Sequence, residues 1–355
     1  MSLSSIWWQQ VGSSLRMRQE VVRRLQNEES FVLRVPLRMP WQEDFYELMR
    51  DRLSSLNANR MVRFLTCDSA LSPGQQILNE LCSEDVRTSY WPGQSYAEYL
   101  AGLRDVPFNQ MFIWVKNIMT SASLEQWRSF AAQYRASRSA EAGAHAVFIL
   151  EYHTANSNSG GSGEVIYSIS DRDCQVFCLE ASALFEELPW EYLSTLALCV
   201  GGGEPEKCAV LIQAGKEFLS DPEVTGQEIL SQGYYSNEEP FPIPQEGTVR
   251  SSVWRAQIMV LFPLLEAHRF RYIYTNYDRL QRYLPLPDEN GAVIHQPYDL
   301  EFGNLYYLTR QVGTSFSREE AENIRICRSI RNLLAHNNLV PYEDVMHLLR
   351  METSN

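Results

Sequence analysis

The feature that most constrains the fold is the alternation, in the first half of the chain, of short apolar runs with longer amphipathic stretches. The runs carry hydrophobic side chains at nearly every position, which is typical of strands buried on both faces. Strands of that kind, separated by helices, indicate a parallel sheet that is covered on both sides. We therefore predict an α/β fold with a parallel sheet, whose first strands are Phe31–Val35, Met61–Cys67, Met111–Val115 and Ala146–Tyr152.

Two further apolar runs, at 165–169 and 176–179, could add two more strands. Beyond residue 184 the pattern changes, and long amphipathic stretches such as 251–283 and 318–337 predict helices. A chain of 355 residues exceeds one average domain. The segment from Tyr234 to Gly247 contains three prolines, which is typical of a linker. We therefore divide the chain into an α/β domain over 1–184, a helical segment with the Pro-rich linker over 185–248, and a helical domain over 249–355.

Composition limits the class of protein. The chain is 45% hydrophobic and 12% aromatic, which supplies enough apolar side chains for packed cores. It has no run of about 18 apolar residues and no basic region before an apolar stretch at its start, so we expect neither a membrane span nor a secretory signal. The seven cysteines are scattered in apolar runs, which indicates reduced thiols in a cytoplasmic protein. We expect no metal site and no cofactor.

The order of strands and helices over 5–184 resembles that of P-loop and AAA+ ATPases. In that family a glycine-rich loop after the first strand offers backbone N–H groups and a lysine to phosphates, and an acidic pair after a later strand holds Mg²⁺. The corresponding loop here, Pro36 to Gln42, has neither glycine nor lysine, and its prolines lack N–H donors. Lys116 and Asn117 stand where the acidic pair should be. The resemblance therefore implies a P-loop-like domain that lacks a Walker motif and does not hydrolyse nucleotide.

A second glycine-rich stretch also departs from the Walker pattern. Residues 201–208 read Gly-Gly-Gly-Glu-Pro-Glu-Lys-Cys, with glutamate and cysteine where the pattern needs glycine and serine or threonine. We interpret the glycines as the end of one helix, and Glu204-Pro205-Glu206 as the start of the next.

Six arginines and seven aromatic residues lie between Val249 and Leu284, against two acidic residues. Arginine pairs with phosphate, and aromatic faces stack on unpaired bases, so this pattern indicates a helix that binds nucleic acid. The alternative is an amphipathic helix whose aromatic residues belong to the core and whose arginines face solvent or acidic neighbours. On the first interpretation, the residues that contact nucleic acid are Arg269, Arg271, Arg279 and Arg282.

A predicted helix near the C-terminus contains Arg331-Asn332-Leu333-Leu334-Ala335-His336. The sequence from Ser317 to Glu320 fits a capping box at its start, and Asn337-Asn338 can close it. Arg328, Asn332 and His336 are spaced by four, so they should lie along one face. Arg331 sits roughly 140° round the helix from His336, at about 100° per residue, and flanks that row.

An arginine followed by a polar residue, with a histidine shortly after it near a helix end, resembles the signature of the HEPN superfamily. The resemblance implies metal-independent RNA cleavage at a dimer interface. Arg331 would stabilise the phosphorane charge, Asn332 would orient the site, and His336 would act as general acid or base. Two other interpretations remain: an inactive HEPN-like module for binding or dimerisation, and a structural role in which these side chains bond to neighbouring helix ends.

We therefore expect a non-hydrolysing scaffold or regulatory subunit of an intracellular complex. Its partners would be other protein subunits or a second copy in a dimer, with RNA as a further partner and no membrane. The alternative is a HEPN-type endoribonuclease whose α/β half senses a trigger. The combination of these parts is similar to that of prokaryotic antiviral defence systems.

Overall fold

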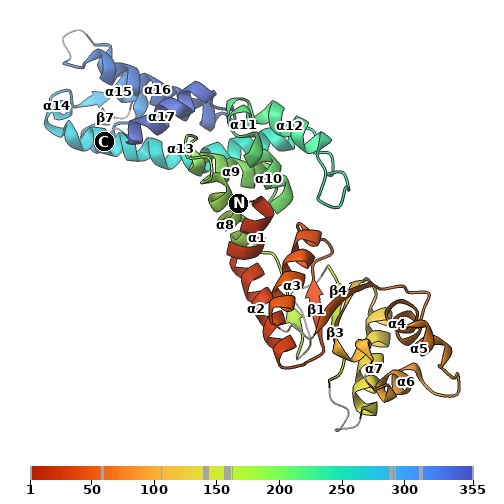
Figure 1. Cartoon of the computed structure of the whole chain (residues 1–355). Helices are drawn as coiled ribbons and strands as arrows, with labels where there is room; N and C mark the ends of the chain where they lie inside the picture. Colours follow the sequence, from red (N-terminus) through yellow and green to blue (C-terminus); the bar gives the residue numbers. More distant parts are fainter. Residues whose placement is uncertain are drawn as a thin grey trace. The chain divides into compact units, whose positions relative to one another are not determined.

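The computed structural model describes residues 2–56, 60–104, 106–138, 144–155, 161, 163–287, 291, 293–311 and 315–353. The chain forms two compact units, Met1–Asp173 and Cys174–Asn355 (Figure 1). The first unit holds a five-stranded parallel sheet, and the second is mostly helical. The predicted α/β fold with a parallel sheet and a helical second half is therefore confirmed. Within the described ranges, no helix is both long enough and apolar enough to cross a membrane.

The sheet has the strand order β2-β3-β4-β1-β5, and each neighbouring pair is parallel. β1 comes first in the sequence but lies inside the sheet, where it pairs with β4 from Phe31 opposite Ile149 to Val35 opposite His153. The connections between the first four strands contain helices, as parallel pairing requires. The strands are β1 (Phe31–Val35), β2 (Met61–Thr66), β3 (Met111–Ile118), β4 (Val147–His153) and β5 (Val165–Ile166).

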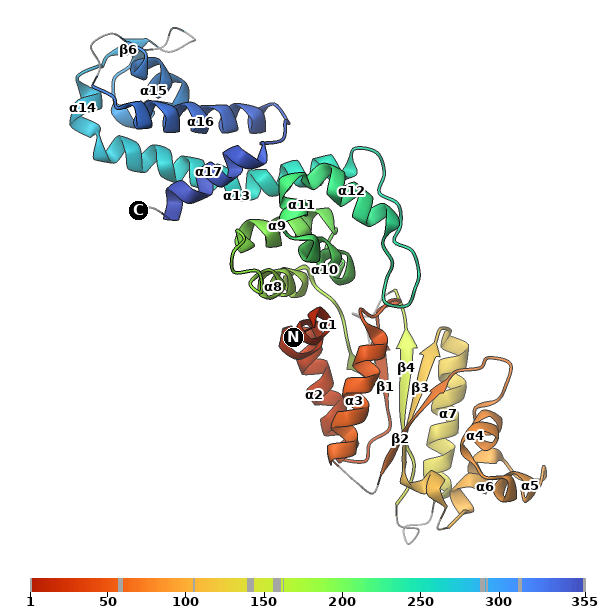
Figure 2. The ribbon, with the colours of Figure 1, turned by 45° about the horizontal axis from the view of Figure 1, so that its top comes forward.

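Helices cover both faces of the sheet, with α3 and α7 on opposite sides (Figure 2). Side chains alternate along β4, so Phe148 and Leu150 join the core on the α7 side, whereas Ile149 and Glu151 face α3. The helices of the first unit are α1 (Leu3–Gln10), α2 (Gly12–Gln26), α3 (Gln42–Leu56), α4 (Pro73–Leu81), α5 (Glu84–Thr88), α6 (Tyr96–Gly102) and α7 (Ser121–Ser137), with a 3₁₀ turn at Pro107–Gln110. The next helix, α8 (Asp171–Ser182), belongs mostly to the second unit.

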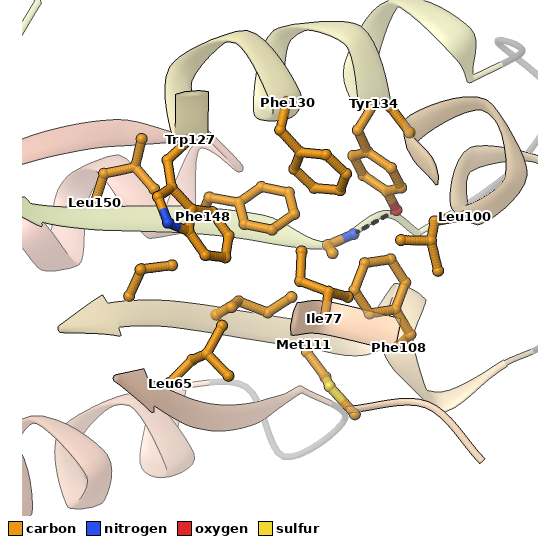
Figure 3. Close-up of a cluster of buried hydrophobic side chains, with 14 of the residues drawn as sticks. Leu65, Ile77, Leu100, Phe108, Met111, Trp127, Phe130, Tyr134, Phe148 and Leu150 are labelled. Atoms are coloured by element: carbon orange, nitrogen blue, oxygen red, sulfur yellow. Dashed lines mark hydrogen bonds between the residues drawn. The ribbon is translucent and has the colours of Figure 1, made fainter. Parts of the chain in front are cut away.

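Aromatic residues about one helical turn apart build the core on the α7 side. Trp127, Phe130 and Tyr134 are buried on one face of α7 and point toward β4 (Figure 3). Phe148 of β4 meets the last two of these rings edge-on, with centroid distances of 5.9 and 5.7 Å. The Tyr134 hydroxyl accepts the Ala146 backbone N–H at 3.1 Å, so this buried hydroxyl is hydrogen-bonded within the core.

In the second unit α13 (Thr248–Thr275) is the longest helix, and several others pack along it. Its buried Gln257 donates to Tyr192 Oη at 3.2 Å and to Val340 O at 3.0 Å, and accepts the Val340 N–H at 2.8 Å. The other elements are α9 (Trp190–Val200), α10 (Pro205–Ala214), α11 (Lys216–Ser220), α12 (Pro222–Gln232), α14 (Tyr277–Gln281), β6 (Leu286–Pro287), β7 (Val293–Ile294), a 3₁₀ turn (Pro297–Asp299), α15 (Phe302–Thr309), α16 (Arg318–Ala335) and α17 (Tyr342–Thr353).

The division into units differs from the predicted boundaries at 184 and 248. α9 and α12 pack against α13, and α10 packs against α9, so residues 185–248 share a unit with the helices that follow. The Pro-rich segment is attached to that unit as well. Ser236 donates its backbone N–H and its hydroxyl to the buried Glu206 carboxylate, at 3.1 and 2.6 Å.

The predicted strand at 176–179 is wrong, because these residues belong to α8. A window of four apolar residues does not distinguish a strand from a buried helix. The predicted helix over 251–283 divides at Asn276 into α13 and α14. Near the N-terminus, α1 and α2 are separated at Val11, whose backbone is extended. The buried residues of α8 recur every three or four positions, which is the period of a helix: Cys174, Phe177, Cys178 and Ala181.

Phe148→Ala should lower the free energy of unfolding of the first unit by about 3–5 kcal/mol, because it leaves a cavity between α7 and the sheet. Urea unfolding followed by tryptophan fluorescence measures the change. Leu37→Ala is the control, because the Leu37 side chain is 56% exposed, and it should change stability by no more than about 0.5 kcal/mol. Equal effects of the two substitutions would contradict this account of the core.

Candidate functional site

α16 carries the Arg-Asn-x-x-x-His motif, and its start is capped as the sequence predicts. Ser317 Oγ accepts the Glu320 backbone N–H at 3.1 Å, and the Glu320 carboxylate accepts the Ser317 N–H at 2.7 Å. These bonds satisfy N–H groups that the first turn leaves without helical partners. Near the other end, Trp254 of α13 donates its indole N–H to Leu334 O at 3.0 Å, which attaches the last turn to α13.

The end of α16 fixes the position of His336. Asn337 has a left-handed backbone with φ of 56°. The N–H groups of Asn337 and Asn338 bond back to the carbonyls of Leu334 and Leu333, at 3.3 and 2.9 Å. This is the Schellman pattern of a helix C-terminus. The predicted closure by two asparagines is confirmed, and His336 is the C-cap residue of the helix.

One face of α16 lines a groove of about 420 Å³, with Tyr306 of α15 on its wall. Arg328, Asn332 and His336, the row predicted from the four-residue spacing, all line it. Arg331 is exposed beside the groove, with its Nη1 atom 3.4 Å from Asn332 Oδ1. The geometry thus brings Asn332 and His336 together with Arg328, and it leaves Arg331 on the flank.

The groove combines an imidazole with two guanidinium groups. Arg325 pairs with Glu322 at 2.7 Å, and the Arg328 guanidinium lies over the Tyr306 ring at 4.9 Å from its centroid. Guanidinium groups bind phosphate, and an imidazole transfers protons near neutral pH. This face of α16 is therefore chemically able to bind a phosphodiester and to donate or accept a proton through His336.

Arg269 is buried within the second unit. It therefore does not lie on the exposed nucleic-acid-binding surface that the sequence predicts. Its side chain is 8% exposed and pairs with Glu266 at 2.8 Å. The same guanidinium donates to Tyr298 O and Leu300 O at 3.2 and 3.1 Å. It therefore holds the segment before α15 against α13, and its N–H groups are directed into the protein.

Arg279 is also engaged within the unit. Its Nη2 atom lies 2.5 Å from Glu320 Oε1 and 2.7 Å from Tyr272 Oη. Arg271 and Arg282 are exposed. The four arginines therefore do not form one basic surface, because acidic and carbonyl groups from other segments bind two of them.

The ion pair between Arg279 and Glu320 helps to lower the pKa of the Glu320 carboxyl. Burial tends to raise the pKa of Glu320, but the hydrogen bonds from Arg279 and from the Ser317 N–H outweigh it, and the pKa lies below its usual value. Burial also raises the pKa of the Tyr272 phenol. Glu320 is therefore ionised at neutral pH, and its charge is compensated by Arg279.

A second cluster of polar groups lies at the carboxyl edge of the parallel sheet, around the fully buried Glu151. Its Oε1 atom accepts from Tyr46 Oη at 2.6 Å, from Gln42 Nε2 at 3.2 Å and from His153 Nε2 at 2.8 Å. Its Oε2 atom accepts from Trp114 Nε1 at 2.7 Å. The charge of this carboxylate is thus met by four donors from α3, β3 and β4.

The loop after β1 and the start of α3 lie beside this cluster. His153 Nδ1 lies 3.4 Å from Leu37 O in that loop. The first turn of α3 carries Glu43 and Asp44, so carboxylates occupy the helix N-terminus where a phosphate would be stabilised. Lys116, at the end of β3, lies 3.7 Å from Glu43 Oε1 and packs over the ring of Tyr46.

The glycine-rich stretch 201–208 is a junction between helices, as the sequence predicts. α9 ends at Val200 with Gly201 as its C-cap, and α10 begins at Pro205. Lys207 Nζ lies 2.6 Å from Glu204 Oε1 and is largely buried. Its ammonium group is therefore bound within the unit.

The sequence did not lead us to the Glu151 cluster. The one feature of the sequence that could have indicated it is a glutamate near the end of an otherwise apolar strand. A carboxylate that is buried there requires hydrogen-bond donors from other segments. Among the described residues, no group of three or more His, Cys, Asp or Glu side chains is arranged to hold a metal ion.

Comparison with protein-family models finds no match, and a search of curated proteins finds no significantly similar sequence.

Glu320→Gln should destabilise the second unit at pH 7 by about 1 kcal/mol or less, because the pair with Arg279 is partly solvent-screened. A carboxyl whose folded-state pKa is lowered stabilises the fold above its unfolded pKa, and this contribution is lost as the pH falls through the folded pKa. The difference between wild type and variant should therefore shrink below about pH 4. Urea unfolding at several pH values measures it.

Glu319→Gln is the matched control, because Glu319 is an exposed carboxylate in the same helical turn. It should have a smaller effect at pH 7. A Glu320→Gln cost that stays constant from pH 7 to pH 3 would contradict the assigned ion pair.

Proposed function

We propose that this chain is a non-hydrolysing scaffold or regulatory subunit of a larger complex, whose α/β unit is P-loop-like in topology. The observation that carries the proposal is the buried Glu151 carboxylate with its four donors. In open α/β sheets, ligands bind outside the carboxyl ends of the strands. Here that edge is occupied by side chains of the protein.

The strand order supports the likeness to P-loop ATPases, because β1 lies between β4 and β5 and continues into the loop that would bind phosphate. Two features of this chain oppose phosphate binding there. Pro36 and Pro40 lack N–H donors, and Glu43 and Asp44 add negative charge at the start of α3. A sheet with this edge supplies rigidity and does not supply a nucleotide switch.

A row of exposed apolar side chains supports a role in protein contacts. Met259, Phe262, Phe270 and Tyr274 of α13 are between 44% and 74% exposed. At about 100° per residue they fall within an arc of roughly 120°. Apolar surface gathered on one side of a helix is typical of an interface with another protein, here another subunit or a second copy of the chain.

MgATP titrated into the full chain should give no binding heat at about 1 mM nucleotide by isothermal calorimetry. The double variant Glu43→Gln/Asp44→Asn removes the repulsion at the start of α3 and leaves the Glu151 cluster intact. It too should not bind, because side chains already occupy the edge. Micromolar affinity in either protein would overturn the proposal of a non-hydrolysing scaffold.

The second candidate is a HEPN-type, metal-independent endoribonuclease. The observation that favours it is the groove in which His336, Asn332 and Arg328 lie on one face of α16. His336 would transfer the proton between the 2′-hydroxyl and the leaving oxygen, and an arginine would stabilise the phosphorane charge. The motif assigns that charge to Arg331, whereas the groove offers Arg328.

His336→Ala should lower cleavage of single-stranded RNA by about 10²–10⁴-fold in buffer with a chelator, because it removes the general acid or base. Arg328→Ala should also lower it, through loss of charge stabilisation. Arg318→Ala is the control, since Arg318 is an exposed arginine at the far end of the same helix. Circular dichroism checks the fold, and wild-type protein that cleaves no RNA would end this candidate.

A further inference from the structure

Tyr306 of α15 lies on the wall of the His336 groove, and two guanidinium groups lie over its ring. Those of Arg310 and Arg328 are 5.8 and 4.9 Å from the ring centroid. Arg310 also donates a hydrogen bond from Nη1 to Tyr306 Oη at 2.9 Å. Arg310 is the C-cap residue of α15, whereas Arg328 belongs to α16, which packs against α15. One tyrosine therefore contacts cations from two helices.

Both guanidinium groups keep N–H donors for a ligand. Within the part of the chain that the structure describes, neither Arg310 nor Arg328 forms a salt bridge with a carboxylate. Arg310 is exposed, and Arg328 lines the groove. A guanidinium group has five N–H donors, and the bond to Tyr306 uses one of those of Arg310. Because contact with the ring already restricts both side chains, they lose less conformational entropy when they bind an anion.

The carboxylates near the groove are engaged with a third arginine. Arg325 also lines the groove, and its pKa lies above its usual value, first because of its hydrogen bond with Glu322 and also because of the charge of Asp344. The chain as a whole has a formal net charge of −13. An anionic ligand in the groove is nevertheless attracted by Arg310 and Arg328, whose charges no ion pair among the described residues compensates.

The groove is long enough for more than one phosphate. The residues of α16 that line it run from Arg325 to His336, which extends over about 16 Å at 1.5 Å per residue. A strand of nucleic acid carries one charge at every nucleotide, so several charges fall within this length. Unpaired bases also stack on guanidinium groups and aromatic rings. A peptide rich in carboxylates lacks that contact.

We propose that Tyr306 is a positioning residue that holds Arg310 and Arg328 as two clamps for neighbouring phosphates of a single-stranded nucleic acid. Both groups lie within 6 Å of one ring centroid, which suits phosphates of the same strand. The inference rests on the endoribonuclease candidate for the role of the groove, and it adds the residues that hold the strand. Binding of the strand does not require that His336 be catalytic.

Fluorescence anisotropy with a labelled 2′-O-methyl RNA of about ten nucleotides tests the clamps, because this strand has no free 2′-hydroxyl and is not cleaved. Titration of the full chain at several salt concentrations gives the slope of log Kd against log salt concentration. Each phosphate contact on a single strand contributes about 0.7 to that slope. Arg310→Gln and Arg328→Gln should each weaken binding and lower the slope by about 0.7. Arg318→Gln should leave it unchanged, because Arg318 is exposed at the far end of α16 and does not line the groove.

Substitutions of the tyrosine separate its ring from its hydroxyl. Tyr306→Leu should lower the slope by about 1.4, because both clamps lose their support. Tyr306→Phe keeps the ring under Arg328 and removes the hydroxyl that Arg310 binds, so it should lower the slope by about half as much. Tyr307→Leu is the matched control, since Tyr307 is 52% exposed on the same helix and does not line the groove. Thermal melting checks that each variant is folded.

A wild-type slope in Arg310→Gln or in folded Tyr306→Leu would overturn the inference. So would the absence of binding at low salt, and so would equally tight binding of poly-glutamate, which would assign the groove to an acidic protein surface. If the modified strand binds as expected but unmodified RNA is not cleaved, the ribonuclease candidate fails and the inference stands. If RNA is cleaved and Tyr306→Leu leaves KM unchanged, the inference fails and the ribonuclease candidate stands.

Discussion

The carboxylate of Glu151 is the constraint on which the first unit depends. A carboxylate removed from water costs several kcal/mol unless charge-assisted hydrogen bonds compensate it. Here the compensation comes from Gln42 and Tyr46 of α3, Trp114 of β3 and His153 of β4. Because the donors belong to different elements, satisfying one carboxylate fixes the start of α3 against the ends of two strands.

The same interaction engages several polar groups at the carboxyl edge of the sheet. The Glu151 carboxylate accepts hydrogen bonds from donors that a bound anion at this edge would need. The side chains of Tyr46 and Trp114, which supply two of these bonds, are buried. Burial and the nearby Glu151 charge raise the pKa of Tyr46, so its hydroxyl stays protonated and remains a donor. The polar groups at this edge are thus bonded to one another within the chain.

The sequence was sufficient to predict the elements whose burial leaves a recognisable run of apolar residues. Strands covered on both faces leave continuous apolar runs, so β1 to β4 could be found from the sequence, whereas the short run in α8 could not be assigned. The partners of Glu151 depend on β4 lying beside β3 and β1, which no local pattern encodes. The same holds for Arg269 and Arg279, because counting charges in a window cannot reveal a carbonyl or a carboxylate contributed by a distant segment.

The motif on α16 shows how helix geometry separates residues that the sequence groups together. Five positions along the helix, from Arg331 to His336, correspond to roughly 140° of rotation at about 100° per residue. Four positions, from Asn332 to His336, keep two side chains near one face, and Arg328 extends that row. Within one chain, the cations that line the groove with His336 are Arg325, which pairs with Glu322, and Arg328. Arg331 is exposed on the flank of this row, and its long side chain brings Nη1 to 3.4 Å from Asn332 Oδ1. The arginine of the motif therefore meets the His336 row through Asn332, because the helix does not place it on the same face.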